Sequence, residues 1–410
     1  MSTVVRGDAA PTGSAPLPDL VPAPETAGDK AGNGAGGGAP QPKKRLYVLD
    51  GLRLIAALMV VAYHYMGFDD WYASPWGKST STVFPTTQTA ASYGWLGVEL
   101  FFLISGFVIC MSCWGRTPKQ FAVSRFIRLY PAYWFAIAAT TTVLVLRPGG
   151  TDVPPTDMLT NITMFQELLG ARDIDGVYWS LWVELRFYLL FMVVAMMGLT
   201  YRRVVGFCVI WLLLAGIAPQ SGIDLLPLLI VPQYAAFFVG GIVIYLMHRV
   251  GPTPVLWLLL GTSWLMAQNQ LPDLISTAED STHTTIYWTV CLAVVTLFYL
   301  LVLAAALGKL NFFNWRWLTV AGAMTYPLYL IHEDIGWEVI RHTHRLMPPF
   351  VLISLLVCTM LLAAWLIQKY VETPVAKALK NWLLPKKPAK PVPTPVPAPK
   401  AGADSGATAG

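Results

Sequence analysis

Two residues of the first long apolar segment have side chains that could bind a ligand or take part in catalysis. Their spacing places them on one face of a helix. Arg53 and His64 are eleven residues apart, and eleven steps of about 100° end about 20° beyond three full turns. The two side chains therefore project from the same face, about 16 Å apart along the axis. This face could bind an anion at one end and supply a general base at the other. A proton relay and a polar pair that joins two helices are the alternatives.

Further polar residues could take part in the same chemistry. Glu99 and Glu184 enter their apolar segments at a depth from which either carboxylate could orient the imidazole of His64 or stabilise its charged form. Ser105 is a candidate nucleophile if a base lies beside it in space, and His332 ends a later apolar segment. The competing interpretation of each residue is a hydrogen bond between helices.

Arg125 and Arg128 form an Arg-x-x-Arg sequence at the start of another apolar segment. Positive residues often flank the cytoplasmic ends of membrane spans, which would explain the pair without any ligand. Arginine forks also suit phosphate oxygens, and both residues would lie at the depth of Arg53. The sequence therefore predicts a site for a polyphosphate-bearing ligand on the cytoplasmic side.

Membrane-spanning helices must position these residues, because the composition excludes a soluble fold. Of the 410 residues, 55% are hydrophobic and 12% are charged, with a mean hydropathy of +0.54, whereas soluble domains carry about 25% charged residues. The net charge of +5 does not indicate nucleic-acid binding, since the basic residues fall in short loops between apolar segments. The five cysteines lie in apolar stretches, so neither a disulfide framework nor a metal site is expected.

The hydropathy pattern predicts an all-α membrane protein with about ten transmembrane helices. Eighteen Lys and Arg residues flank the ends assigned to the cytoplasm, whereas the opposite loops hold five basic and fourteen acidic residues. This bias predicts a multi-pass protein of the cell membrane with both termini in the cytoplasm. The expected spans are residues 46–66, 94–114, 128–146, 179–198, 203–218, 228–247, 254–267, 285–307, 317–332 and 348–370.

Composition divides the chain into three regions. Residues 1–45 are rich in Gly, Pro and Ala, which predicts a disordered cytoplasmic tail. Residues 385–410 are rich in Pro, Lys and Ala, which predicts a second such tail. The integral membrane domain is expected to cover residues 46–384.

Six motifs occur in a fixed order along the membrane domain. The first is Asp-Gly-Leu followed by Arg53, ten further residues and His64. The others are residues 94–107, 125–131, 179–188, 325–332 and 372–374. Together they resemble the acyltransferase-3 family of bacterial integral-membrane O-acyltransferases, whose signature is Arg-x10-His in the first span, and the resemblance covers about residues 46–375.

The resemblance implies transfer of an acyl group, usually acetyl, from cytoplasmic acyl-CoA to a hydroxyl of a carbohydrate or glycosylated acceptor. It also implies that His64 is the catalytic base, that Arg53 belongs to the acyl-CoA path, and that Arg125 and Arg128 bind the CoA phosphates. Acyl-CoA is then a donor substrate, and neither a permanently bound cofactor nor a metal is expected.

The remaining motif residues receive less specific roles. Ser105 and Glu184 are expected to be catalytic, and Tyr326, His332 and Glu99 are expected to bind the acceptor at the outer mouth of the site. Direct transfer and a transient acyl-enzyme both stay open. The acceptor could be a surface glycan, a lipid-linked sugar or a glycosylated metabolite. The alternative function is a secondary transporter or an exporter of a glycosylated product.

Overall fold

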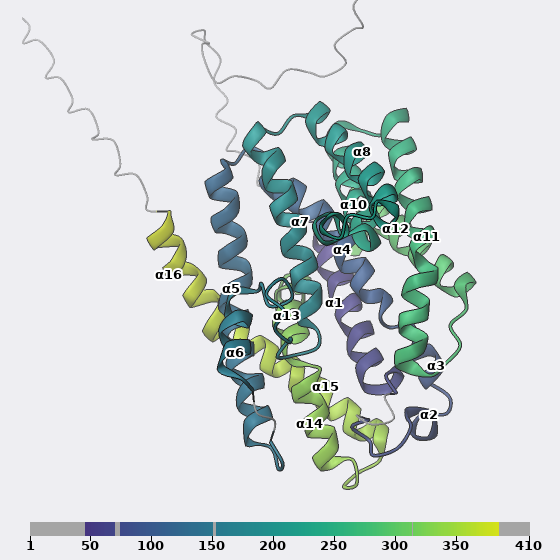
Figure 1. The fold of residues 1–410 in the computed structure, drawn as a ribbon, viewed down its shortest axis with the longest axis vertical. Coiled ribbons are helices and arrows are strands. Elements are labelled where there is room, and N and C mark those ends of the chain that lie inside the picture. The colour runs from purple at the N-terminus through teal and green to yellow at the C-terminus, as the bar shows by residue number, and fades with distance from the viewer. Residues whose placement is uncertain (1–45, 70–73, 151–152, 314, 385–410) are drawn as a thin grey trace, which may run out of the picture. The chain divides into compact units, whose positions relative to one another are not determined.

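The computed structural model describes residues 46–69, 74–150, 153–313 and 315–384. Within these ranges every regular element is a helix (Figure 1), which confirms the expected all-α fold. The two expected tails, residues 1–45 and 385–410, lie outside the described residues.

The elements follow one another along the chain with short connections. They are α1 (Tyr47–Ala62), a π-helical turn η1 (Tyr63–Gly67), α2 (Thr80–Val83), α3 (Gln88–Ala91), α4 (Leu96–Cys113), α5 (Pro118–Leu146), α6 (Pro155–Thr163), α7 (Tyr178–Met197), α8 (Tyr201–Ile217), η2 (Ala218–Gln220), α9 (Leu225–Ile230), α10 (Pro232–Val250), α11 (Pro254–Thr282), α12 (Trp288–Ala306), η3 (Asn311–Phe313), α13 (Leu318–Ile331), α14 (Asp334–Thr343), α15 (Pro349–Ile367), η4 (Gln368–Glu372) and α16 (Thr373–Leu383).

Eight helical segments of the described chain are long and apolar enough to cross a membrane. Each contains or overlaps one of the ten expected spans. The two other expected spans are also helical, but 254–267 belongs to the longer and less apolar α11, and 317–332 coincides with the 14-residue α13. The eight segments are Tyr47–Gly67, Gln88–Cys113, Pro118–Leu146, Tyr178–Met197, Tyr201–Gln220, Leu225–Val250, Trp288–Ala306 and Pro349–Leu383. A total of ten spans and the cytoplasmic termini stay predictions.

The start of α5 is fixed by its own sequence. The Thr117 hydroxyl accepts a hydrogen bond from the backbone N–H of Gln120 at 3.2 Å, and the Gln120 side chain accepts one from the N–H of Thr117 at 3.0 Å. This capping box precedes Pro118 at the first helical position, where its missing N–H is not needed. The cap places Arg125 about two turns and Arg128 about three turns into the helix.

Close backbone contact between α4 and α10 forms the centre of the bundle (Figure 1). Fourteen of the 18 residues of α4 are buried. A Cβ atom on Gly106 would lie 2.1 Å from the carbonyl oxygen of Phe238, and one on Gly241 would lie 1.9 Å from the carbonyl oxygen of Leu103. Small residues permit such contact between membrane helices, which gain stability from packing. The glycines therefore hold α4, which carries Glu99 and Ser105, firmly in place.

Gly106→Ala should destabilise the protein, because its methyl group overlaps the Phe238 carbonyl and the two helices must move apart. Overpacking of this kind costs about 1–3 kcal/mol. Thermal unfolding in detergent should show a Tm several degrees below that of the wild type. Gly206→Ala in α8 is the matched control, since a Cβ there meets nothing within 4 Å. Equal Tm values for the two variants would contradict the packing argument.

Candidate active site

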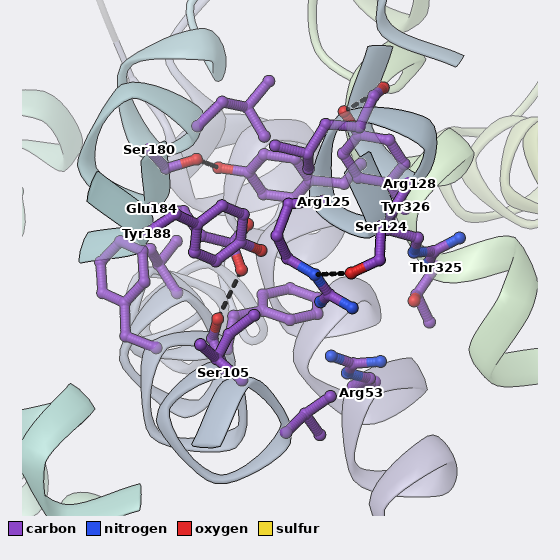
Figure 2. Close-up of a pocket in the computed structure, with 18 residues that line it drawn as sticks. Arg53, Ser105, Ser124, Arg125, Arg128, Ser180, Glu184, Tyr188, Thr325 and Tyr326 are labelled. Carbon is purple, nitrogen blue, oxygen red and sulfur yellow. Dashed lines mark hydrogen bonds between the residues drawn. The ribbon is translucent and has the colours of Figure 1, made fainter. Parts of the chain in front are cut away.

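Three arginines gather around one cavity of about 340 Å³ between α1, α4, α5, α7 and α13 (Figure 2). We call it the arginine cavity. The guanidinium groups of Arg53 and Arg125 extend into it from different helices, and Arg128 lies beside them. Among the lining residues Glu184 is the acidic one, so cations predominate. The grouping agrees with the predicted anion site. The other polar residues that line it are Ser105, Ser124, Ser180, Tyr188, Thr325, Tyr326 and Tyr329.

Each α5 arginine is held by a neighbour but keeps donors available. Arg128 forms an ion pair with Glu372, and its guanidinium carbon lies 5.4 Å from the ring centre of Tyr326. Arg125 donates from Nε to the Ser124 hydroxyl at 3.3 Å (Figure 2). A guanidinium has five N–H donors, so each side chain can still bind phosphate oxygens.

Ser105 and Glu184 form a short hydrogen bond inside the arginine cavity (Figure 2). The Ser105 hydroxyl donates to Glu184 Oε1 at 2.5 Å, which brings a base to the serine from another helix. Glu184 therefore lines the arginine cavity with Ser105 and Arg53, whereas His64 lines a different cavity. The expectation that Glu184 orients the imidazole of His64 stays a prediction. Tyr326, expected at the outer mouth, instead lines the arginine cavity and donates to the carbonyl of Leu129 at 2.9 Å.

A second cavity of about 430 Å³ lies farther along α1. We call it the aromatic cavity, because six rings line it together with His64, Glu99 and Glu333. Val98 and Tyr329 line both cavities, so the two share a wall. Arg53 and His64 thus line neighbouring cavities, which fits the expected common face of the first helix. The six rings belong to Tyr63, Phe68, Trp95, Trp179, Tyr234 and Tyr329.

His64 lies on the π-helical turn that ends α1, where the backbone leaves regular α-helical geometry. Two hydrogen bonds from distant parts of the chain hold this turn. The Trp337 indole donates to the carbonyl of His64 at 2.9 Å, and the Tyr65 hydroxyl donates to the carbonyl of His332 at 2.7 Å. The position of the imidazole is therefore set by tertiary contacts as well as by the helix.

The hydrogen bonds of two histidines assign their tautomers. His332 Nδ1 lies 2.8 Å from the backbone carbonyl of Tyr329, which can only accept, so this nitrogen carries the proton. In neutral His332 the Nε2 atom is then an acceptor. It lies 2.9 Å from Nδ1 of His64, so His64 Nδ1 donates. His64 Nε2 is left with a free lone pair, as a general base requires.

His332 therefore contacts His64 directly and is fully buried. Its expected role in acceptor binding stays a prediction. Sequence reasoning missed Glu333, whose Oε1 lies 3.7 Å from His64 Nε2. The run of three ionisable residues His332, Glu333 and Asp334 at the end of an apolar segment was the signal that could have identified it.

A cluster of buried carboxyl groups begins at Glu333, beside this histidine pair. Burial together with the charge of Asp334 raises the pKa of Glu333 to about 8, and burial raises the pKa of Asp334 to about 6. Asp175 is fully buried, and its burial raises its pKa, as do the nearby charges of Asp334 and Glu333. The cluster therefore holds protons at neutral pH that free carboxyl groups would release.

Glu99 also lines the aromatic cavity, as its expected role in acceptor binding requires. It is 2% exposed, and its Oε2 has no hydrogen-bond partner among the described residues. The role itself stays a prediction.

The carboxyl cluster makes stability depend on pH. A carboxyl with a raised folded pKa binds protons in the native state that the unfolded chain has released, so the free energy of unfolding falls as pH rises from about 4 to 8. Glu333→Gln removes one such group, so its Tm relative to wild type should be higher at pH 8 than at pH 5. Asp273→Asn, at an exposed position of α11, is the control. A pH-independent difference for Glu333→Gln would contradict the assignment.

Comparisons with known proteins agree with this arrangement. A family model described as an acyltransferase domain matches residues 46–369. "Protein 2 in picA locus" of Rhizobium radiobacter is 36% identical over 104 residues, which are 24% of this chain and 44% of that protein. "Nodulation protein 10" of Rhizobium leguminosarum bv. viciae is 31% identical over 166 residues, which are 34% of this chain and 41% of that protein.

A third relative is "Peptidoglycan O-acetyltransferase OatA" of Listeria monocytogenes, which is 33% identical over 102 residues, or 23% of this chain and 13% of that protein. Each match thus spans less than half the length of the relative. No solved structure matches the chain. The family match, in contrast, covers well over half of the chain and includes both cavities. The chain is therefore a member of the acyltransferase domain family, with the apolar helices of a multi-pass membrane protein.

Proposed function

We propose that this protein is an integral membrane O-acyltransferase that moves an acyl group from acyl-CoA to a hydroxyl of a carbohydrate or glycosylated acceptor, with acetyl as the simplest group. The observation that carries the proposal is the unprotonated Nε2 of His64. His64 lines the aromatic cavity, which shares a wall with the cavity lined by three arginines. Membership of the acyltransferase family supports acyl transfer. A relative named as a peptidoglycan O-acetyltransferase supports a hydroxyl acceptor.

The arginine cavity supports acyl-CoA as the donor. Arg53, Arg125 and Arg128 supply guanidinium groups for the CoA phosphates. The narrow pantetheine arm would then extend toward the wall formed by Val98 and Tyr329. Basic residues cluster near the end at which α1 begins, so we propose that this end faces the cytoplasm, where acyl-CoA is made.

In the proposed reaction, His64 Nε2 removes the proton of the acceptor hydroxyl while its oxygen attacks the thioester carbonyl. The new C–O bond forms, the C–S bond breaks, and the CoA thiolate takes the proton from the imidazolium. The products are an O-acyl ester and free CoA, so atoms and charge balance. His332 accepts from His64 Nδ1 and so keeps the lone pair on Nε2, as the third member of a catalytic triad does.

Ser105 offers a second route through an acyl-enzyme. Its hydrogen bond to Glu184 supports it as a nucleophile, because the carboxylate can take the hydroxyl proton as Oγ attacks the thioester carbonyl. The C–S bond then breaks, and the CoA thiolate leaves with the proton from Glu184, so that a Ser105 ester and free CoA are formed. The acceptor, activated by His64, would then attack the Ser105 ester. In both routes the acyl group must reach the wall that the two cavities share.

His64→Ala should abolish acceptor-dependent CoA release and leave acyl-CoA binding intact, because the base does not line the arginine cavity. Loss of a general base lowers kcat by about 10²–10⁴-fold. Arg53→Ala should instead weaken acyl-CoA binding by about tenfold or more, since a hydrogen bond to a charged group contributes about 1.5–3 kcal/mol. The measurements are CoA release and acyl-CoA titration in nanodiscs, with the exposed Arg172→Ala as control. Full activity of His64→Ala would contradict the proposal.

His332→Ala should lower kcat without changing the KM for acyl-CoA, because His64 is then free to protonate on either nitrogen. The pH–rate profile should also shift, since His64 Nδ1 has then lost its side-chain acceptor. His332→Gln should recover part of the activity, because its amide oxygen can accept the same hydrogen bond. An unchanged pH profile, or no rescue by Gln in a folded variant, would show that His332 serves packing alone.

A further inference from the structure

The aromatic cavity carries acidic groups without cationic partners. Among the described residues that line it, Glu99 and Glu333 are acidic and none is Lys or Arg. A carboxylate or phosphate group on the acceptor would lose its hydration on entering this cavity. It would find no positive side chain there and would lie beside two carboxyl groups, so its binding would be strongly unfavourable. The lining therefore disfavours an anionic acceptor.

Both acids have an oxygen that lacks a partner. Oε2 of Glu99 and Oε2 of Glu333 are buried and make no hydrogen bond within the described part of the chain. Glu99 is 2% exposed and Glu333 is 7% exposed. An unsatisfied buried carboxyl is costly, so its presence in a cavity indicates that a ligand supplies the missing donor.

Aromatic faces complete the same cavity. The rings of Trp179 and Tyr234 lie 5.5 Å apart between centres, and Tyr63 and Trp95 line the cavity beside them. Rings of this kind stack on sugars and attract cations through their π faces. Rings together with carboxyl oxygens form a site that suits an ammonium group better than a neutral hydroxyl.

We propose that the acceptor carries a positively charged amino group, as an amino sugar does. The ammonium group would lie against the aromatic rings and Glu99, with Glu333 near by, while a hydroxyl of the same molecule faces His64 Nε2. This inference rests on the proposed function, since it names the acceptor class of that reaction.

Three methyl hexosides of equal size test the charge requirement. One carries a dimethylamino group, whose nitrogen cannot form a stable amide, one is neutral, and one is a uronic acid. Binding to the full protein in nanodiscs is followed by tryptophan fluorescence, because Trp95 and Trp179 line the cavity. O-acetyl transfer from acetyl-CoA is followed by mass spectrometry. We expect the amino glycoside to bind at least about tenfold more tightly than the neutral one, with no detectable binding of the uronic acid.

Glu99→Gln should reduce the preference for the amino glycoside over the neutral one by about tenfold, and Asp273→Asn, exposed on α11, should leave that preference unchanged. Equal or tighter binding of the neutral glycoside would overturn the inference. Glu99-dependent binding of the amino glycoside without acyl transfer would support the inference and refute the proposed reaction. Transfer to the neutral glycoside alone would support the reaction and refute the inference.

Discussion

The hydrogen bond between His64 and His332 is the interaction on which the account of this site depends. Residues 268 positions apart meet at 2.9 Å in a buried part of the bundle. The carbonyl of Tyr329 fixes the His332 proton, and this in turn leaves Nε2 of His64 basic. A buried imidazole pair needs this ordered arrangement, because an unpaired polar nitrogen would be costly away from water. The tautomer of His64 is thus a consequence of how α13 packs against α1.

Arginine side chains and carboxyl groups line two different, neighbouring cavities of the bundle. Cationic side chains from α1 and α5 line one of them, and carboxyl groups from α4 and the start of α14 line the other. Tyr329 belongs to the shared wall, and its hydroxyl lies 2.7 Å from that of Ser180. A polyphosphate donor and a cationic acceptor would each find a complementary environment, and their reactive atoms would meet only at this wall. The close glycine contacts hold α4, which carries Val98 of this wall, against α10.

Much of the fold could be predicted from the sequence, because the length of an apolar segment and the residues that cap a helix are local properties of the chain. The helices and the grouping of Arg53 with Arg125 and Arg128 follow from segment position and depth. The partner of His64 could not be predicted in this way, because depth places three candidates, Glu99, Glu184 and His332, near the level of His64 and says nothing of which helix faces which. The sequence therefore favoured Glu184 or Glu99 beside the imidazole and assigned His332 to acceptor binding. The π-helical turn at His64 also has no clear sequence signal.

The protonation state of His64 tests the central claim most directly. The protein has six histidines, so ¹⁵N-histidine labelling and nitrogen NMR in nanodiscs give a spectrum simple enough to assign by its difference from His64→Gln. We expect His64 to be protonated on Nδ1 with Nε2 free, and we expect His332→Ala to weaken this preference. A His64 protonated on Nε2 in the wild type would contradict the account, because that nitrogen could not then accept a proton from the acceptor.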